Sequence, residues 1–292
     1  MDLAGYREYA DACPDAVILT DLEARILHVN PVFETLTGYG LAEIAGRTPA
    51  LLKSGVHEAD FYRGLFAAIS SGREFKATFI NRKKSGEKYF EEKIIRPLFD
   101  PGGRITHYAS FGRDATLRAR ELERLTHAAT HDSLTDLPNR SLFLDRLAQA
   151  LRHAARRNEE FTVAIMDLDR FRDTNSRFGH LGGDAVLEAV ALRTRGCLRD
   201  VDTVARIGGD EFALILVDTG GEAAASVLDK VVATNAARVR FENQAIPASV
   251  SIGACCYPRD AATEQDLLKG ADRAMYAAKH GGGNRCRFYS PG

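Results

Sequence analysis

The sequence lacks tryptophan, has few cysteines and carries almost no net charge. Its cysteines form no CxxC pair, and no histidine cluster stands at zinc-binding spacing, so neither a zinc site nor a disulfide framework is predicted. We interpret them as thiols in a reducing compartment; they are Cys13, Cys197, Cys255, Cys256 and Cys286. The net charge of −1 argues against nucleic acid and anionic membranes as partners, because binding either requires a basic face.

Long apolar segments are also absent. No run approaches the roughly 20 residues that span a bilayer, and the first residues, Met1–Ala4, lack the basic and then apolar start of a secretion signal. We therefore expect a cytoplasmic protein without a membrane segment. The 292 residues favour two domains, because one domain usually has about 100–200 residues.

The pattern of the first segment, up to about residue 115, predicts strands with short helices between them. Ala16–Thr20 and Arg25–Val29 alternate as strands do, and Asn30-Pro31 opens a helix that ends near Gly38. Three further strands are separated by turns rich in glycine, aspartate and proline; they are expected at Phe75–Arg82, Lys88–Pro97 and Ile105–Arg113. This order predicts a sheet with helices inserted between its second and third strands.

Three stretches in this segment, "HVNPVFETLTGY", "NRKKSGEKYFEE" and "RPLFDPGGRITHYASFGRDAT", resemble the PAS family over residues 8–116. The resemblance implies an antiparallel sheet with flanking helices, and a sensor or dimerisation domain whose pocket holds haem, flavin or a small metabolite. The run Gly46–Leu52 has no cysteine where LOV photoreceptors need one, which argues against LOV photochemistry. Without tryptophan, a flavin would have to stack on phenylalanine or tyrosine. His28, His57 and His107 are candidate haem contacts, or simply core or surface histidines. The ligand itself is not named by the sequence.

A helical linker is expected at residues 117–130. Leu122, Leu125 and Ala129 stand at spacings of three and four, but Arg118 occupies the preceding position of that stripe. The segment is therefore either a short dimeric coiled coil or a solvated linker helix, since one or two heptads are marginal alone.

The second segment, from His131 onward, alternates helix and strand. Helices are expected at Ser141–Arg157, Gly182–Arg195, Glu222–Val239 and Glu264–His280. Strands are expected at Phe161–Asp167, Thr203–Ile207, Phe212–Val217 and Ala248–Ala254. This β-α-β-β-α-β order is that of a ferredoxin-like core, so the fold class is α/β (α+β).

Two acidic turns carry the chemistry of this segment. Met166–Phe171 ends a strand and enters a helix, and Gly208–Phe212 forms a tight hairpin. Mg²⁺ prefers carboxylates together with substrate phosphates, and a helix N-terminus offers N–H groups to phosphate oxygens. Two metals that bridge phosphates and polarise an attacking hydroxyl are a common design for phosphoryl transfer. The alternative is an ordinary hairpin and a solvated acidic loop.

Four stretches in order resemble the GGDEF family of diguanylate cyclases over about residues 130–290. They are "HDSLTDLPNR" at 131–140, "DLDRFRDTNSRFGHLGGD" at 167–184, "RIGGDEF" at 206–212 and "ADRAMYAAKHGGGNR" at 271–285. The resemblance implies a nucleotidyl-cyclase-like GGDEF domain at 131–290 that condenses two GTP into cyclic di-GMP and two pyrophosphates. It also implies Mg²⁺ or Mn²⁺ as cofactor, a homodimer with one GTP in each facing domain, and control by the PAS domain.

The resemblance assigns roles to individual residues. Asp167, the Leu168 carbonyl and Asp210 match the metal ligands; Asp210 also matches the base that deprotonates the attacking 3′-hydroxyl, and Glu211 lies in the same turn. Asn175 and Asp184 match the residues that hydrogen-bond guanine. A carboxylate there can accept from guanine N–H groups that adenine lacks. Three further residues match substrate contacts: Phe171, His180 and Lys279, the last at the phosphates.

Three positions depart from the family pattern. Arg172 replaces a lysine among the catalytic residues and keeps its charge, Ser176 replaces an aspartate, and Gly283 replaces a phosphate-binding arginine. These departures leave two alternatives to the enzyme: a non-catalytic receptor for GTP or cyclic di-GMP, and an interaction scaffold driven by the PAS domain.

The last motif is Arg199-Asp200-Val201-Asp202, which has the form RxxD. The five residues Thr203–Ile207 separate it from Gly208, and at this spacing family members carry an inhibitory site for the product. Arginine offers a charged planar fork to phosphate or to the guanine Hoogsteen edge, and we expect Asp202 to accept from guanine N–H groups. The alternative is a chance pattern in a polar loop.

Overall fold

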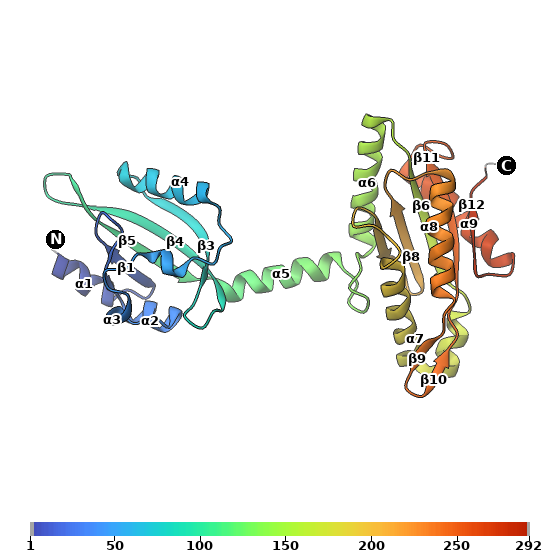
Figure 1. Ribbon diagram of the computed structural model, residues 1–292, viewed down its shortest axis with the longest axis horizontal. Coiled ribbons are helices and arrows are strands. Elements are labelled where there is room, and N and C mark those ends of the chain that lie inside the picture. Colours follow the sequence, from blue (N-terminus) through green and yellow to red (C-terminus); the bar gives the residue numbers. More distant parts are fainter. Residues whose placement is uncertain (1–2, 291–292) are drawn as a thin grey trace. The chain divides into compact units, whose positions relative to one another are not determined.

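The structure is a computed structural model and describes residues 3–290. The chain divides into two compact units between Arg124 and Leu125, called here the N-terminal and C-terminal units (Figure 1). Among the helices of the described residues, none combines the length and the apolar character needed to cross a bilayer. All five cysteines are unpaired, as the sequence predicts.

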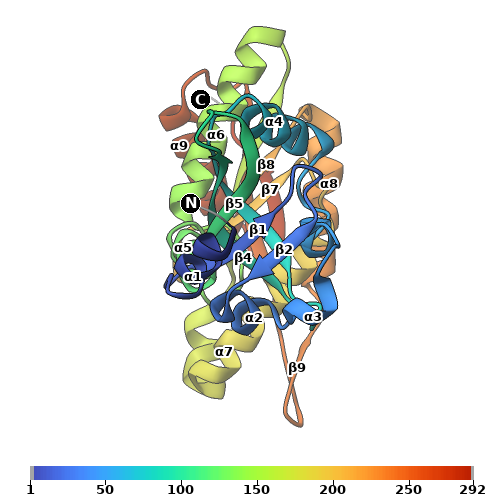
Figure 2. The same ribbon diagram turned by 90° about the vertical axis from the view of Figure 1, so that its left-hand side faces the viewer.

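The N-terminal unit is an antiparallel sheet of five strands with helices inserted after the second strand (Figure 2). The strands are β1 (Ala16–Thr20), β2 (Ile26–Val29), β3 (Phe75–Arg82), β4 (Lys88–Phe99) and β5 (Ile105–Asp114). Their order in the sheet is β2-β1-β5-β4-β3, and every neighbouring pair is antiparallel. The helical elements are α1 (Leu3–Asp11), α2 (Pro31–Thr37), α3 (Leu41–Ile44), the 3₁₀ helix η1 (Pro49–Leu52) and α4 (Ala59–Ser70). The sheet expected from the sequence is confirmed.

One buried side chain organises the start of this unit. The Asn30 side-chain oxygen accepts hydrogen bonds from the backbone N–H of Phe33 at 3.0 Å and of Val17 at 2.9 Å. Its amide nitrogen donates to the carbonyl of Ala10 at 3.0 Å. Asn30 thus caps α2 and ties it to β1 and α1, while Gly38, with φ of 77°, ends α2 in a left-handed conformation.

The C-terminal unit has a ferredoxin-like core with additions. Its helices are α6 (Arg140–Arg157), α7 (Phe171–Arg195), α8 (Gly221–Asn235) and α9 (Glu264–His280). Its strands are β6 (Phe161–Leu168), β7 (Thr203–Arg206), β8 (Glu211–Leu216), β9 (Val239–Phe241), β10 (Gln244–Ile246), β11 (Val250–Tyr257) and β12 (Arg285–Phe288). The order β11-β6-β8-β7 with antiparallel neighbours is that of the ferredoxin-like fold, and β12 adds in parallel to β11. The predicted fold class is confirmed.

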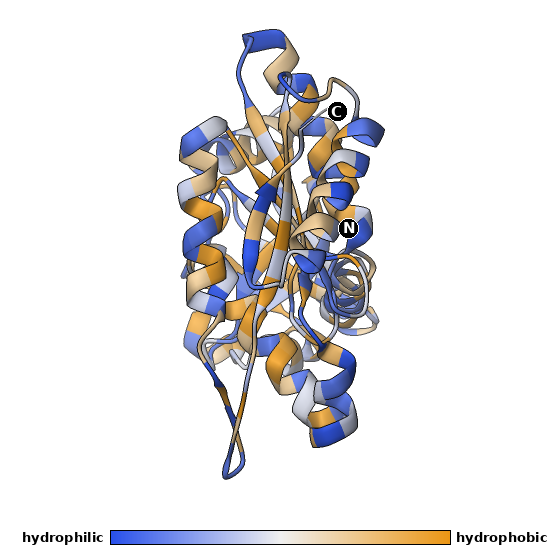
Figure 3. Ribbon diagram, turned by 90° about the vertical axis from the view of Figure 1, so that its right-hand side faces the viewer, coloured by the Kyte–Doolittle hydropathy of each residue, from blue (hydrophilic) through white to orange (hydrophobic). Residues whose placement is uncertain are grey.

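Alternation along the strands builds two apolar layers, one on each face of this sheet. Even-numbered residues of β6, such as Met166, pack with α7 and α8, and odd-numbered ones, such as Ile165, pack with α6 and α9. Figure 3 shows the consequence: hydrophobic residues fill the strands, and the helices at both sides carry a mixture of hydrophobic and hydrophilic residues. Helices on both faces fix the ends of the strands, where the acidic turns lie.

Several boundaries differ from those expected. Helix α7 begins at Phe171, not at Gly182, because Gly179 interrupts it with φ of 72° rather than preventing it. Helix α8 ends at Asn235, since Val239 already begins the β9–β10 hairpin. Strands β9, β10 and β12 have only three or four residues, too few for alternation to reveal them.

Helix α5 (Thr116–Thr130) follows β5 and spans the division between the units. Its apolar residues are not covered by the chain: Leu117, Leu122 and Leu125 are 84%, 65% and 51% exposed. Leu122 and Leu125, three residues apart, lie on one side of the helix, and the described residues leave this side uncovered.

Gly253 on β11 generates a first prediction. A Cβ atom there would lie 1.9 Å from the Met275 nitrogen and 2.1 Å from the Ala271 carbonyl oxygen, so α9 packs directly on the bare strand. We expect Gly253→Ala to lower the free energy of unfolding of the C-terminal unit by about 3 kcal/mol or more, because backbone atoms have to move apart. Urea denaturation followed by circular dichroism measures the change.

Gly196→Ala is the matched control. Gly196 has φ of −68°, and a Cβ there would meet its nearest neighbours at 3.5 Å, an ordinary contact. Its effect should stay within about 1 kcal/mol. Equal destabilisation by the two substitutions would contradict the packing argument.

Candidate active site

Three carboxylates gather at one edge of the C-terminal sheet. Asp167, near the end of β6, pairs in register with Glu211 on β8 and with Ser251 on β11. The Leu168 N–H donates to the Asp210 carbonyl at 3.3 Å, which closes the two acidic turns on each other. The turns that were expected to share an ion therefore lie side by side.

Asp167 is the most deeply buried of these acids. Its residue is only 6% exposed, and burial raises the pKa of its carboxyl to about 6. The charges of Asp210 and Glu211 contribute to this raised pKa, and the Lys279 ammonium opposes it. Lys279, in the last turn of α9, lies 2.5 Å from Asp167 Oδ1 as an ion pair. The three carboxylates therefore attract a cation, and in this structure that cation is the Lys279 ammonium.

This donor set fits a hard divalent ion. Asp167, Asp210 and Glu211 offer carboxylate oxygens, and Leu168, whose carbonyl is the further ligand that the resemblance implies, directly follows Asp167. Mg²⁺ takes oxygen ligands and usually shares them between one or two carboxylates and substrate phosphates. The ammonium already drawn to Asp167 is a stand-in for such a cation.

Arg206 shapes the Gly-Gly turn, and sequence reasoning missed it. Its guanidinium donates to the Gly209 carbonyl at 2.7 and 3.1 Å and to the Asp132 carboxylate at 3.0 Å. Burial would raise the pKa of Asp132, but hydrogen bonds from Thr135 and Arg206 outweigh it and hold that pKa below its usual range. Arg206 thus ties the hairpin turn to the start of the unit. Its place directly before the Ile-Gly-Gly turn was the available signal.

Asp169 is a second residue whose part was missed. Its carboxylate accepts hydrogen bonds from Ser249 Oγ at 2.8 Å, Ser251 Oγ at 2.6 Å and the Asn284 N–H at 2.8 Å. A Cβ on Gly283, which has φ of 70°, would lie 3.0 Å from both carboxylate oxygens of Asp169. The glycine found in place of the family's arginine is therefore packed against a structural anchor.

One of the expected guanine readers, Asn175, packs against the second part of α7, beyond the break at Gly179. A Cβ on Gly183 would lie 1.9 Å from Asn175 Oδ1 and 3.2 Å from the ring of Phe171, so these side chains pack on the bare backbone beside Asp184. The break at Gly179 folds the two parts of α7 close enough for this contact. Asn175 and Phe171 therefore both pack against Gly183, the residue that precedes Asp184.

The other two expected residues on α7 lie at its surface. Arg172 is exposed in the first turn, where no side chain of the described residues caps the helix N–H groups. His180 is exposed beside the break and lines a hollow of about 380 Å³ with Phe178, Phe241 and Glu242. His180 thus faces the β9–β10 hairpin.

Arg199 and Asp202 form a clamp at the other end of the β7–β8 pair. The Asp202 carboxylate accepts hydrogen bonds from Arg199 Nε and Nη2, each at 3.2 Å, and from the Val217 N–H at 3.1 Å. Arg199 also donates to the Val217 carbonyl at 2.8 Å, yet its side chain is 58% exposed, against 2% for Asp202. The structure therefore does not favour the expectation that Asp202 accepts from guanine; Asp202 orients Arg199.

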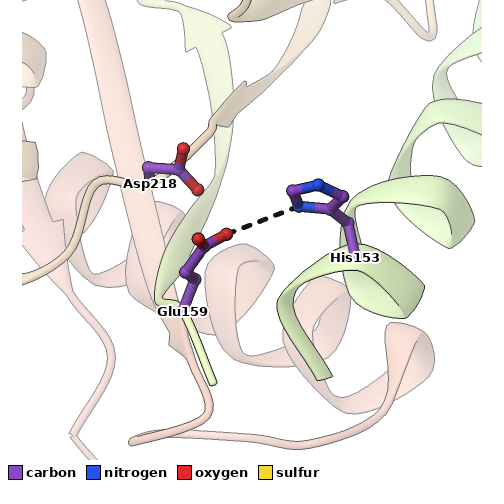
Figure 4. A group of neighbouring side chains, drawn as sticks. All are labelled: His153, Glu159 and Asp218. Carbon is purple, nitrogen blue, oxygen red and sulfur yellow. Dashed lines mark ion pairs between the residues drawn. The ribbon is translucent and has the colours of Figure 1, made fainter. Parts of the chain in front are cut away.

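A separate group of possible metal ligands is shown in Figure 4. His153, Glu159 and Asp218 each offer one ligand atom, and these atoms lie within 4.8 Å of one another. His153 Nδ1 and Glu159 Oε2 are 3.4 Å apart. They come from the end of α6, the residues before β6 and the residues after β8, so they lie at the opposite end of these strands from Asp167. The group is not part of the candidate active site.

Comparisons with known proteins agree with this geometry. Residues 129–285 match the family described as "Diguanylate cyclase, GGDEF domain", and residues 14–116 match the PAS domain family. The diguanylate cyclase TpbB of Pseudomonas aeruginosa is 40% identical over 206 residues, which are 66% of this chain and 46% of TpbB. The chain thus spans less than half the length of that relative.

Solved structures match the C-terminal unit. The GGDEF domain of TpbB from Pseudomonas aeruginosa is 43% identical with a TM-score of 0.54, covering 55% of this chain and 94% of that one. A second structure holds the coiled coil and GGDEF domain of DgcB from Caulobacter crescentus in complex with c-di-GMP. It is 30% identical with a TM-score of 0.54, and the match covers 59% of this chain and 92% of the DgcB chain. Because the GGDEF match alone takes in more than half of the sequence, the chain belongs to the diguanylate cyclase GGDEF-domain family, and a PAS domain precedes that region.

Proposed function

We propose that this chain is a diguanylate cyclase, which condenses two GTP molecules into cyclic di-GMP and releases two pyrophosphates. The observation that carries the proposal is the meeting of Asp167, Asp210 and Glu211 at one sheet edge, with the Lys279 ammonium among them. The PAS domain is assigned to residues 8–116, the linker to 117–130 and the cyclase domain to 131–290. A cytoplasmic location remains part of the proposal.

Different residues of the chain are assigned to metal binding, proton transfer and phosphate contacts. Asp167, the Leu168 carbonyl and Asp210 would hold Mg²⁺ or Mn²⁺, which acts as a Lewis acid on the reacting phosphate. Asp210 takes the proton of the attacking 3′-hydroxyl, with Glu211 beside it in the turn. Lys279 leaves Asp167 for the phosphate oxygens once a stronger cation is present. Arg172 and the uncapped N–H groups at the start of α7 neutralise further phosphate charge.

Guanine recognition is assigned to the neighbourhood of the α7 break. Asn175 and Asp184 hydrogen-bond the guanine edge, Phe171 packs beneath them, and His180 contacts the substrate from the second part of α7. The contact of Asn175 with the bare backbone of Gly183 supports this assignment, because it fixes the amide next to Asp184.

Two cyclase domains are needed, since each holds one GTP and each 3′-hydroxyl attacks the other's α-phosphate. Holding both reactants face to face is itself a large part of such catalysis. The exposed Leu122 and Leu125 on α5 support a homodimer through this helix, in preference to a solvated linker. A PAS ligand would then shift productive and unproductive dimers by its differential affinity for them.

Product inhibition is assigned to Arg199, held by Asp202. Its guanidinium is exposed while Asp202 and the Val217 carbonyl keep it in place, which suits capture of a phosphate or a guanine edge. Cyclic di-GMP bound there would hold two domains in a non-facing arrangement and separate the two GTP molecules.

Loss of a metal-binding carboxylate tests the proposed reaction. We expect Asp167→Ala and Asp210→Ala to reduce the formation of cyclic di-GMP at least about a hundredfold, because a ligand of the phosphate-bridging metal is lost. Chromatography of the products after incubation with GTP and Mg²⁺ measures the rate. Asp229→Ala, which removes an exposed carboxylate on α8, is the matched control and should leave the rate unchanged. Comparable turnover by the folded Asp167 or Asp210 variant would refute the assignment.

Nucleotide preference tests the guanine site. ATP should be a poor substrate, because a hydrogen-bonding pair left unpaired can discriminate by orders of magnitude. Asn175→Ala should lower the ratio of kcat/KM for GTP to kcat/KM for ATP by at least about tenfold. Gly183→Ala should do the same by displacing the Asn175 amide. Equal turnover of the two nucleotides by the unaltered protein would exclude this site.

The inhibition curve with added cyclic di-GMP tests the product site. Arg199→Ala should raise the concentration for half-inhibition at least about tenfold, the loss expected for a hydrogen bond to a charged group. Arg195→Ala, an exposed arginine in the last turn of α7, should leave the curve in place. Urea denaturation checks that loss of the Asp202 partner leaves the unit folded. Coincident curves for the unaltered protein and folded Arg199→Ala would remove the product site from the proposal.

A further inference from the structure

The N-terminal unit contains a cavity of about 230 Å³ between its sheet and α4. Most of its wall is apolar and comes from β1, η1, α4 and β3; it includes Ile18, Leu52, Leu65, Ile69 and Phe79. Lys93 on β4 and Ser110 on β5 also line it, and both are buried. An apolar chamber with a few convergent polar groups is the usual form of a small-molecule site.

A buried ion pair lies in the wall of this cavity. Lys93 Nζ is 3.0 Å from Glu91 Oε2, and the two side chains are only 5% and 2% exposed. Glu91 also accepts from the Asn81 amide at 2.8 Å and lies 3.4 Å from the Tyr89 hydroxyl that donates to it. Gly112 makes room for it, since a Cβ there would lie 1.7 Å from Glu91 Oε1. Glu91 is therefore fully engaged in the protein and fixes the ammonium beside the cavity.

Lys93 and Ser110 are the buried donors of the lining that come from β4 and β5 and have donor capacity left for a ligand. The Lys93 ammonium has three N–H donors, and Glu91 is the ion-pair partner that the structure gives it. The Ser110 hydroxyl is buried and has no hydrogen-bond partner among residues 3–290. Ser110 pairs in register with Ile95, two residues along β4 from Lys93, so both donors are on the same face of the sheet. A buried hydroxyl without a partner is unfavourable, and a ligand acceptor would relieve it.

Charge balance decides which acceptor fits. Glu91 already neutralises Lys93, and the other two charged residues of the lining, Lys53 and Glu23, carry opposite charges, so a ligand carboxylate would bring a net negative charge into the site. A carbonyl oxygen can accept from Lys93 and Ser110 without adding charge. We infer that the cavity binds a small neutral molecule with an apolar body and one carbonyl-type acceptor, which Lys93 and Ser110 hold at its polar end.

The volume limits the size of this molecule. An apolar cavity of about 150 Å³ accommodates benzene. A cavity of about 230 Å³ therefore takes one ring or a comparable chain with a short polar substituent. Haem and flavin, built from several rings, are too large for it as it stands. As a regulatory signal, this ligand rests on the proposed function; its binding does not.

Three compounds of similar shape distinguish recognition of a neutral carbonyl from binding of an apolar body alone and from binding of a carboxylate. Acetophenone carries a carbonyl, α-methylstyrene replaces that oxygen by a methylene group, and benzoate carries a negative charge. Titration of the full chain, followed by calorimetry, should give saturable binding of acetophenone at least about tenfold tighter than that of α-methylstyrene. Benzoate should bind more weakly than acetophenone. Equal affinity for the first two, tighter binding of benzoate, or no saturable binding of acetophenone would overturn the inference.

Variants place the acceptor in the cavity. Ser110→Ala removes a hydroxyl that has no hydrogen-bond partner among the described residues. We expect it to weaken the binding of acetophenone several-fold and to leave the affinity for α-methylstyrene unchanged. Ser85→Ala, in the exposed turn before β4, is the matched control and should alter neither. An unchanged preference in Ser110→Ala would contradict the assignment of the hydroxyl.

Lys93 needs a double variant, because its loss alone would leave Glu91 buried without its cation. Glu91→Gln with Lys93→Met removes both charges and should narrow the preference for acetophenone over α-methylstyrene to the several-fold part that the Ser110 hydroxyl supplies. If the folded double variant keeps the full preference for acetophenone over α-methylstyrene, the role of Lys93 is overturned. If the double variant does not fold, the Ser110→Ala variant tests the polar end of the site. A protein that shows the preference but makes no cyclic di-GMP contradicts only the proposed function. One that makes cyclic di-GMP without the preference contradicts only this inference.

Discussion

The C-terminal unit depends on keeping a buried carboxylate next to two others. Asp167 is almost inaccessible to water, and burial together with Asp210 and Glu211 raises its pKa. Such an arrangement is stable only when a cation is close, because desolvation and like charges both oppose ionisation. Lys279 supplies that cation in this structure. In the proposed function a divalent ion and the phosphates of a nucleotide would replace it, because the unfavourable proximity of the carboxylates that draws in the lysine would favour a metal ion as well.

The strand order explains how these groups are brought to one place. Strand β6 is central, so β8 and β11 approach Asp167 from both sides and place Glu211 and Ser251 beside it. Close approach is then made possible by glycine. Gly253 lets α9 rest on β11, which brings Lys279 within reach of Asp167. The contact between α9 and β11 needs a missing side chain, and a methyl group on Gly253 would separate the two elements.

Regular periodicity made most of the fold predictable, since strands such as Ala16–Thr20 and Phe75–Arg82 and the helix Glu264–His280 have the expected bounds. Contacts between distant segments were not predictable. The hydrogen bonds of Asp169 join positions about 80 or more residues apart in the chain, and no local pattern encodes them. Glu91 and Lys93 alternate with other residues as solvent-facing charges would, yet they point into the core because each neutralises the other.

The β7–β8 pair shows how a product site and a catalytic turn can share one rigid element. Arg206 secures the turn at one end through the Gly209 carbonyl, and Asp202 secures the other through Arg199 and the Val217 N–H. A phosphate arriving at Arg199 would compete with Asp202 for the guanidinium, but Asp202 would keep its bond to β8. The hairpin would therefore hold its shape when product binds. The proposed inhibition would therefore act on the placement of one domain against another, because hydrogen bonds hold the β7–β8 pair at both of its ends.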